Sequence, residues 1–222
     1  MAGLEPILYF LETTFDVAEH PDSSRALNGL QVAVDEGLDV ERLAAAVDAS
    51  EETILEAVDR GADLLLVHHG LFWGGTAPLT GALHRKVSAL IRNGVALYSL
   101  HLPLDGHPEF GNNALLMAEL GLEPEGRFGW FQDVQVGWWA TASLSRDGVL
   151  EGLESAVGER CRVIPGGPER VERVGVVTGG GASSLREAAA RGLDSLVTGE
   201  APHHAYHDAM ELADHSLSLA HG

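Results

Sequence analysis

The chain has 222 residues, enough for one sizeable domain or two small lobes, and 45% of them are hydrophobic. Its formal net charge of −19 repels phosphate backbones, so nucleic-acid binding is disfavoured. No apolar run reaches the roughly 20 residues of a membrane-spanning helix, and Met1–Phe15 lacks the basic region of a signal peptide, so we expect a cytoplasmic protein.

Apolar runs alternate with amphipathic segments through the first half of the chain. The predicted elements are a helix over Leu4–Phe15, a loop over Pro21–Asn28, a strand over Ala44–Val47, a helix between Ser50 and Gly61, a strand over Leu64–Val67, a helix over Leu83–Arg92, a strand over Val95–Leu100 and a helix over Asn112–Leu120. Uninterrupted apolar strands are typical of parallel sheets that are covered on both faces. The order predicts an α/β fold with a largely parallel sheet.

The second half begins with a stretch rich in Gly and Glu, which predicts a linker. The predicted elements are a linker over Glu123–Gly129, a strand over Gln132–Leu144, a helix over Gly148–Val157, a strand over Cys161–Ile164, a strand over Val174–Thr178, a turn at Gly179–Gly181, a helix over Ser184–Arg191 and a strand over Leu193–Thr198. Cys161 has no second cysteine to pair with and is expected to pack as a small core residue.

The last block repeats part of the first with a constant offset of 131 residues. Asp63 then meets Asp194, and His69 meets Glu200. Such a repeat indicates two related halves that face one another. Chance similarity between two short strand–helix–strand units is the other interpretation.

Two adjacent histidines, His68 and His69, follow the buried strand Leu64–Val67. Ligands of open α/β sheets bind outside the carboxyl ends of the strands, and neutral imidazole is the commonest protein ligand of transition metals. Adjacent strand residues point to opposite faces, so the pair serves one site only where the strand has just ended or where the site straddles two metals. We therefore predict a metal site, rather than two histidines bonded to backbone carbonyls.

Asp105 lies beyond the next predicted strand, four residues after His101. A carboxylate binds hard or borderline cations and can bridge two of them. Alone, Asp105 would be a loop aspartate, but its position beside the histidines makes it a candidate ligand.

Three further segments carry weaker signals. Glu200 ends a strand, where it is either a base or a plain hydrogen-bond acceptor, and Pro202 is expected in the first turn of a helix on which His203 and His207 share a face. Gly179–Gly181 precedes a helix but lacks a nucleotide-binding spacing, so a tight turn competes with an anion loop.

Together these motifs resemble the Nif-three-like proteins, also named GTP cyclohydrolase 1 type 2 homologues. The shared motifs recur in order along nearly the whole chain: Asn28-Gly29-Leu30-Gln31-Val32, Asp63–His69, Leu97–Asp105, Gly111-Asn112-Asn113 and Thr198-Gly199-Glu200.

The resemblance implies two similar α/β lobes, residues 1–122 and 123–222, with largely parallel sheets facing a central metal-binding cleft. It implies a dinuclear centre whose protein ligands include His68, His69 and Asp105, and a ring-shaped homohexamer. Phe131, Trp138 and Trp139 could supply an interface or could pack a local core.

One departure concerns the last two ligands, which in the family belong to a Gly-His-x-x-x-Glu motif after the final strand. The sequence ends at Gly222, where that motif should begin, and His221 has no glutamate after it. We expect the natural C-terminus to be missing, the visible site to be incomplete and metal binding to be weak without it. His221 is not assigned as a ligand.

Two functions fit these residues. One is a metal-dependent hydrolase of a nucleotide-like or phosphorylated small molecule, and the other is a non-catalytic protein that binds, stores or delivers metal or acts as a scaffold. The mixed imidazole and carboxylate ligands fit two ions of Zn, Fe, Mn or Ni per subunit. The acidic surface would concentrate cations, or it serves solubility alone.

Overall fold

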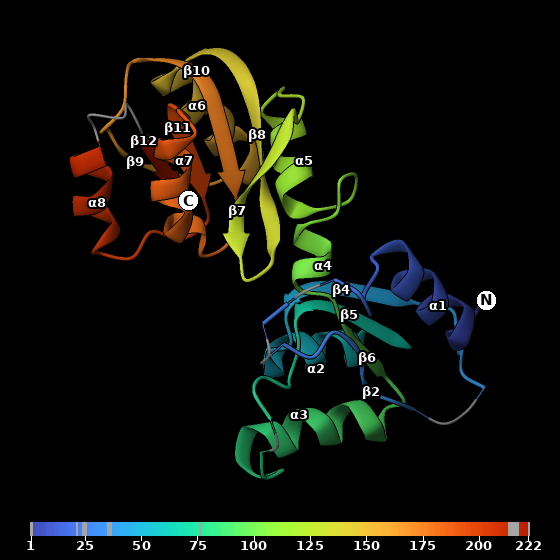
Figure 1. Cartoon of the computed structure of the whole chain (residues 1–222). Helices are drawn as coiled ribbons and strands as arrows, with labels where there is room; N and C mark the ends of the chain where they lie inside the picture. The colour runs from blue at the N-terminus through green and yellow to red at the C-terminus, as the bar shows by residue number, and fades with distance from the viewer. Residues whose placement is uncertain are drawn as a thin grey trace. The chain divides into compact units, whose positions relative to one another are not determined.

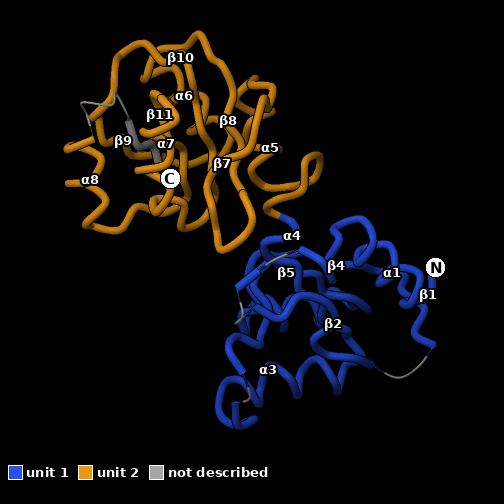
Figure 2. Tube along the Cα trace, in the orientation of Figure 1, with its two compact units in different colours: residues 1–104 blue, residues 105–222 orange. Residues whose placement is uncertain are grey.

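The structure is a computed structural model that describes residues 2–20, 22–23, 26–34, 37–75, 77–212 and the backbone of residues 218–221. The chain forms two compact units, residues 1–104 and 105–222, shown in two colours in Figure 2. The predicted boundary lies after residue 122 instead. The structure groups the helix α5 (Asn112–Glu119) with the second unit, because α5 packs against that unit's sheet.

The first unit is built on a four-stranded sheet in the order β2 (Gly29–Val32), β6 (Ala96–Ser99), β5 (Leu64–His69) and β4 (Leu43–Asp48). Strands β4, β5 and β6 are parallel, and β2 is antiparallel to β6. A short antiparallel pair, β1 (Ala2–Gly3) with β3 (Asp39–Val40), belongs to the same unit. The sheet is therefore largely parallel, as predicted.

Helices cover the two faces of this sheet (Figure 1). Helices α2 (Glu51–Asp59) and α3 (Gly81–Arg92) pack against one core cluster, which contains Ile54, Leu65 and Leu90. Helix α1 (Leu4–Thr14) packs against a second cluster that contains Leu64 and Tyr98. Both sides of β5 are therefore apolar, which explains its uninterrupted apolar run.

The second unit has a six-stranded sheet whose described strands mix both orientations. Their order is β7 (Gly126–Phe131), β8 (Val134–Ser145), β10 (Arg170–Val177), β11 (Ser195–Thr198), β12 (Ser218–His221) and β9 (Arg162–Ile164). Within these strands, β10, β11 and β12 run parallel, and the other pairings are antiparallel. The expectation of a largely parallel sheet is thus wrong for this unit.

Strand β7 corrects the predicted linker over Glu123–Gly129. It forms an antiparallel hairpin with β8, and the turn places Gln132 at a φ of 51°. Helices α5 and α6 (Arg146–Val157) pack over one side of the sheet around Met117 and Leu153. The 3-10 turn η1 (Gly181–Ser184) and the helices α7 (Leu185–Ala190) and α8 (Ala205–Glu211) complete the unit.

The aromatic residues of this hairpin divide between core and surface. Trp138 packs against the core with the Arg127 guanidinium 3.6 Å from its ring, and the Arg173 guanidinium lies 4.5 Å from the ring of Trp139. Phe131 is 38% exposed at the hairpin end. Local packing therefore accounts for the two tryptophans, and Phe131 keeps an accessible face.

The repeat at an offset of 131 residues reappears as a shared hydrogen-bonding pattern. Leu43 pairs with Leu64 in parallel, and Val174 pairs with Ser195 in the same way. In each unit an aspartate that precedes one strand of the repeat accepts hydrogen bonds from two successive backbone amides of the neighbouring chain segment, and an arginine bonds the carbonyls after the helix. The corresponding groups are Asp63 with the amides of Glu41 and Arg42, Asp194 with those of Glu172 and Arg173, Arg42 with the carbonyls of Arg60 and Gly61, and Arg173 with those of Arg191 and Gly192. Chance similarity does not explain a correspondence of this detail.

Tyr98 on β6 carries a buried hydroxyl that has no hydrogen-bond partner within the described part of the chain. Burial, together with the charge of Glu12, raises the pKa of this phenol to about 12. The neutral hydroxyl therefore persists to high pH and contributes an unsatisfied polar group to the core.

Replacing Tyr98 with phenylalanine is expected to leave the free energy of unfolding unchanged or to raise it by about 1 kcal/mol, because the change removes a buried unpaired hydroxyl and keeps the ring. Urea denaturation measures the change. Tyr9→Phe, at a residue that is 71% exposed, is the matched control and should have no effect. A loss of more than about 1 kcal/mol in Tyr98→Phe would show that the hydroxyl has a partner after all.

Candidate metal centre

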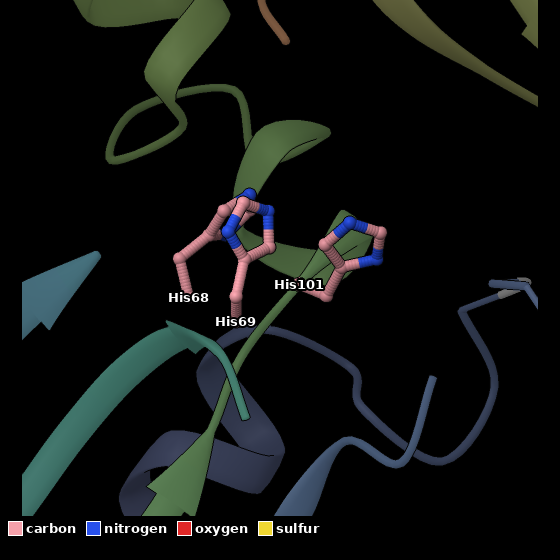
Figure 3. A group of neighbouring side chains, drawn as sticks. All are labelled: His68, His69 and His101. Atoms are coloured by element: carbon pink, nitrogen blue, oxygen red, sulfur yellow. The ribbon is translucent and has the colours of Figure 1, made fainter. Parts of the chain in front are cut away.

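Three histidines converge at the carboxyl ends of two parallel strands of the first unit (Figure 3). His68 and His69 end β5, and His101 follows β6. One ring nitrogen from each lies within 4.8 Å of the others. The cluster can therefore hold a metal ion, and it is the one group of this kind within the described residues.

The two adjacent histidines serve one site, although strand alternation would separate them. Their ring centroids lie 4.5 Å apart, and the His101 ring lies 4.9 Å from that of His68 and 5.6 Å from that of His69. Strand β5 extends through His69 instead of ending at Val67, so the predicted condition that the strand has just ended does not hold. The two rings nevertheless lie beside each other at the end of the strand.

A hydrogen bond from Nδ1 orients each imidazole ring. His68 Nδ1 donates to the Leu100 carbonyl at 2.9 Å, and His69 Nδ1 donates to Asp48 Oδ1 at 2.8 Å. His101 Nδ1 donates to the carboxylate of Asp22 at 3.0 and 3.1 Å. With the proton on Nδ1, each neutral ring carries its lone pair on Nε2, which is the arrangement of a metal-binding histidine with an oriented ring.

Asp22 is the most connected of these supporting groups, and its side chain is only 6% exposed. Its Oδ2 also accepts from Asn28 Nδ2 at 2.8 Å and from the Leu102 amide at 3.0 Å. Burial alone would raise the pKa of Asp22, but the hydrogen bonds from His101 and Asn28 outweigh it and lower the pKa below its usual value. The carboxylate is therefore charged at neutral pH and holds the His101 ring in place.

The Asn28-Gly29-Leu30-Gln31-Val32 motif supports the same edge of the sheet. Asn28 Oδ1 accepts from the His101 amide at 2.7 Å, and Gln31 Oε1 accepts from the Leu71 amide at 2.7 Å. The side-chain amide of Gln31 packs directly over Gly70, where a Cβ would displace it. The motif thus supports the segment after His69 and the backbone of His101.

Trp73 forms an aromatic wall beside the cluster. Its ring lies edge-on to His101 at a centroid distance of 5.1 Å and to His69 at 5.8 Å. Trp73 Nε1 donates to the Gly70 carbonyl at 2.8 Å, and 43% of the residue remains exposed. A planar apolar surface is therefore presented next to the imidazoles.

Asp105 lies at the end of the short helix α4 (Leu102–Asp105) and opens the second compact unit. It is 7% exposed, and its Oδ1 accepts from Asn112 Nδ2 at 2.7 Å. Its backbone carbonyl accepts from Asn113 Nδ2 at 3.1 Å. The converging side chains are the predicted pair, His68 and His69, together with His101. The approach of Asp105 to these histidines stays a prediction.

The other candidates lie in the second unit, near the ends of β10 and β11. His203 precedes α8, which begins at Ala205 rather than at Pro202, yet the rings of His203 and His207 lie edge-on to each other with centroids 6.4 Å apart. Glu200 is exposed and borders a cavity of about 560 Å³, where Arg186 and Asp208 form an ion pair at 3.0 Å.

Within the glycine turn before α7, Gly181 is tightly packed, whereas a Cβ at Gly179 or Gly180 would meet open space. A Cβ at position 181 would lie 2.6 Å from Val177 Cβ and 2.7 Å from Thr198 Oγ1. The close packing of the turn on the side chains of Val177 and Thr198 therefore explains Gly181, in agreement with the tight-turn interpretation. His221 pairs with Thr198 through its backbone, and its side chain lies outside the described atoms.

No helix in the described part of the chain is both long and apolar enough to cross a bilayer.

Sequence relatives are found among proteins named GTP cyclohydrolase 1 type 2 homolog. The protein of Deinococcus radiodurans is 40% identical over 222 residues, covering 99% of this chain and 82% of its own length. That of Treponema pallidum is 40% identical over 232 residues, covering 89% of this chain and 80% of its own.

Solved structures agree over the same length. A protein of Thermus thermophilus superposes with a TM-score of 0.87 at 34% identity, covering 99% of this chain and 85% of its own. Reduced HcgD from Methanocaldococcus jannaschii superposes with a TM-score of 0.85 at 27% identity, covering 99% and 86%. Residues 3–222 match Duf34/NIF3 (NGG1p interacting factor 3), and the chain therefore belongs to this family.

Proposed function

We propose that the chain binds divalent metal through His68, His69 and Asp105 and uses it to hydrolyse a nucleotide-like or phosphorylated small molecule. One observation carries the metal part of the proposal. Three imidazoles converge, and each is turned by an acceptor on Nδ1 so that its Nε2 lone pair serves as the ligand. His101 adds a third imidazole to His68 and His69, the two that the sequence predicts as ligands.

The donor set favours borderline ions. Imidazole suits Zn, Fe and Ni, and an added carboxylate also suits Mn. Two such ions per subunit are proposed, because adjacent histidines and a carboxylate that can bridge fit a pair of cations better than a single closed site. The acidic chain, with its net charge of −19, raises the local cation concentration.

When bound, a divalent ion supplies a strong nucleophile from water at neutral pH and stabilises charge on a leaving oxygen. The chain's own residues would bind and orient the substrate. Trp73 offers its exposed ring for a planar group beside the cluster. The relatives' name refers to a cyclohydrolase, which also uses water to open a bond, and we propose the same general class of reaction here.

A non-catalytic metal-binding, storage or scaffold protein is the second candidate. The acidic charge and the eleven histidines favour it as much as they favour catalysis. The two functions differ in coordination: an enzyme keeps a position open for substrate, whereas a storage site closes its shell with protein ligands.

Metal analysis of the purified protein tests whether the chain binds metal, and a turnover screen tests whether it hydrolyses a substrate. We expect bound divalent metal, and hydrolysis of at least one compound in a panel of nucleotides and phosphorylated small molecules once the preferred ion is added. Stoichiometric metal without turnover across the panel would support storage. Because metal binding is expected to be weak without the last two family ligands, the ions are added in excess, and failure to bind Zn, Fe, Mn or Ni under these conditions would contradict the proposal itself.

Asp22→Asn tests the orientation of His101. The change keeps the side-chain shape but removes the charge that holds the imidazole proton, so metal affinity is expected to fall by about 10- to 100-fold. Isothermal titration with Zn²⁺ measures the change. Asp59→Asn, at an exposed position of α2 in the same unit, is the matched control and should bind as the unmodified chain does.

An unchanged affinity in Asp22→Asn would show that the charge of Asp22 does not support metal binding at His101. The fold provides a separate check, because Asp22 also accepts bonds from Asn28 and Leu102. Circular dichroism before titration therefore distinguishes a lost ligand orientation from a lost fold.

A further inference from the structure

Lys86, the one lysine in the sequence, donates a hydrogen bond from Nζ to the backbone carbonyl of Ala49 at 2.8 Å. The lysine is half-buried on α3, and Ala49 is buried just before Ser50, the N-cap of α2. The Thr53 amide, which could otherwise reach this carbonyl, donates to Ser50 Oγ instead. The ammonium therefore supplies a partner to a buried carbonyl at the point where β4 leads into α2.

Ala49 belongs to the short segment that holds His69. Asp48 Oδ1 accepts from His69 Nδ1 at 2.8 Å, and the Ala49 amide donates to the His69 carbonyl at 2.9 Å. Residues 48 and 49 thus contact both the ring and the backbone of this histidine. Any movement of the segment changes the place of the carboxylate relative to the imidazole.

Two carboxylates orient imidazoles of the cluster, and Asp48 is much the more exposed of them. The Asp48 side chain is 66% exposed, whereas that of Asp22, which orients His101, is 6% exposed and accepts further hydrogen bonds. An exposed carboxylate loses rotamer entropy when it is held in one geometry. The bond between Asp48 and His69 therefore depends on how firmly the backbone that carries Asp48 is held.

Helix α3 holds this segment at a second point. Glu51, two residues beyond Ala49, accepts from Arg85 Nε at 2.7 Å and from Arg85 Nη2 at 2.8 Å. Arg85 and Lys86 are successive residues of α3, and they contact the chain on the two sides of the N-cap. Two neighbouring contacts restrict rotation of the segment as well as its displacement.

The second unit offers an internal comparison, because its matching segment lies beside no histidine. Three positions of the repeat differ in chemistry: Glu200 stands in place of His69, Gly179 in place of Asp48 and Ala182 in place of Glu51. The strand–helix–strand unit therefore folds without these side chains. The ionic contacts of α3 accompany the histidine site rather than the repeated fold.

We propose that Lys86 is a positioning residue for His69. Its bond to the Ala49 carbonyl fixes the backbone that carries Asp48, and Asp48 in turn keeps the proton on His69 Nδ1 and the lone pair on Nε2. The consequence for affinity rests on the metal binding proposed above, whereas the effect on the ring does not. Without the ammonium the segment moves more freely, and the His69 ring occupies both tautomers.

The tautomers of the imidazoles in the metal-free protein give the first test. Long-range proton–nitrogen NMR distinguishes Nδ1–H from Nε2–H in neutral rings through the ring C–H protons. We expect His69 to carry its proton on Nδ1 in the unmodified chain and to become a mixture in Lys86→Met, with His68 and His101 unchanged. A general loss of structure would not select one ring. An unchanged His69 tautomer in Lys86→Met would overturn the proposal.

Isothermal titration with Zn²⁺ gives the second test. Lys86→Met keeps the length of the side chain and should weaken binding by about tenfold, the lower end of the range for outer partners, because Lys86 acts through Asp48. Arg92→Met is the matched control, since it removes one cation from an exposed position of α3 and should leave the affinity unchanged. Lys86→Arg retains a charged N–H donor and should restore most of the affinity. Equal losses in Lys86→Arg and Lys86→Met would contradict the role assigned to the donated bond.

A double-mutant cycle shows whether Lys86 acts through Asp48. In an Asp48→Ala background, Lys86→Met should cause no further loss of Zn²⁺ affinity, because the acceptor that Lys86 positions is already absent. The same loss in both backgrounds would overturn the proposal, since Lys86 would then affect the metal by another route. If the unmodified chain binds no metal, the proposed function fails, while the tautomer of His69 still decides the role of Lys86.

Discussion

Replacing His68 or His69 with alanine is expected to weaken metal binding by more than about 100-fold. Structural zinc sites with about four protein ligands contribute roughly 10–16 kcal/mol, so each ligand accounts for about 3 kcal/mol, and about 1.4 kcal/mol corresponds to a factor of ten. The loss of metal affinity should exceed that in Asp22→Asn, because these variants remove a metal ligand, whereas Asp22→Asn changes only a residue that orients one. The measurement is the Zn²⁺ dissociation constant with metal content per chain.

His84→Ala provides the comparison for these variants. His84 lies on α3 of the same unit, is exposed and contacts Ser88 at 3.3 Å, so its removal changes the histidine count without touching the cluster. Metal content should remain that of the unmodified chain. If His68→Ala and His69→Ala also retain it, the ions bind elsewhere and the proposed centre is wrong.

Asn113→Leu is expected to lower the free energy of unfolding of the second unit by roughly 4 kcal/mol, because three buried backbone groups lose their partner at about 1–3 kcal/mol each and the added apolar contact offsets part of the loss. Asn113 is 1% exposed. Its amide donates to the carbonyls of Asp105 at 3.1 Å and Val136 at 3.0 Å, and it accepts from the Thr178 amide at 2.6 Å. One side chain thus joins the last residue of α4 to strand β8 and to the residue that follows β10.

Urea denaturation followed by tryptophan fluorescence measures this loss, since Trp130, Trp138 and Trp139 all lie in the second unit. Asn93→Leu is the control, because Asn93 is exposed and bonds only within its own helix end, to the Ala89 carbonyl. The control should remain within about 0.5 kcal/mol of the unmodified chain. A similar result for Asn113→Leu would show that water replaces the lost amide.

The sequence predicts those parts of the fold that depend on local pattern. The apolar run Leu64–Val67 predicts β5, and the repeat predicts that the second unit reuses the same strand–helix–strand unit. The segment Glu123–Gly129 carries no such pattern, because β7 is stabilised by pairing with β8 and contains two glycines. Pairing between segments is a long-range property, and composition alone therefore suggested a linker.

In the candidate site, too, the features set by local sequence pattern are predictable and those set by long-range contacts are not. His68 and His69 follow an apolar strand, so their place at the sheet edge is predictable, and His101 follows the next strand in the same way. Asp22 and Asp48 orient the rings from segments 79 and 21 residues away in sequence, and nothing around either aspartate marks such a role. The Asn28-Gly29-Leu30-Gln31-Val32 motif was a usable signal, since Asn28 and Gln31 hold the loops of the site.

The paired aspartates, Asp63 and Asp194, have a consequence for how the chain folds. Each closes a loop of only 21 or 22 residues, between the start of one strand and the start of the next. Loop closure over such short separations costs little entropy and occurs early. We therefore expect each half of the chain to form these contacts early on its own, the N-terminal half before the second has left the ribosome.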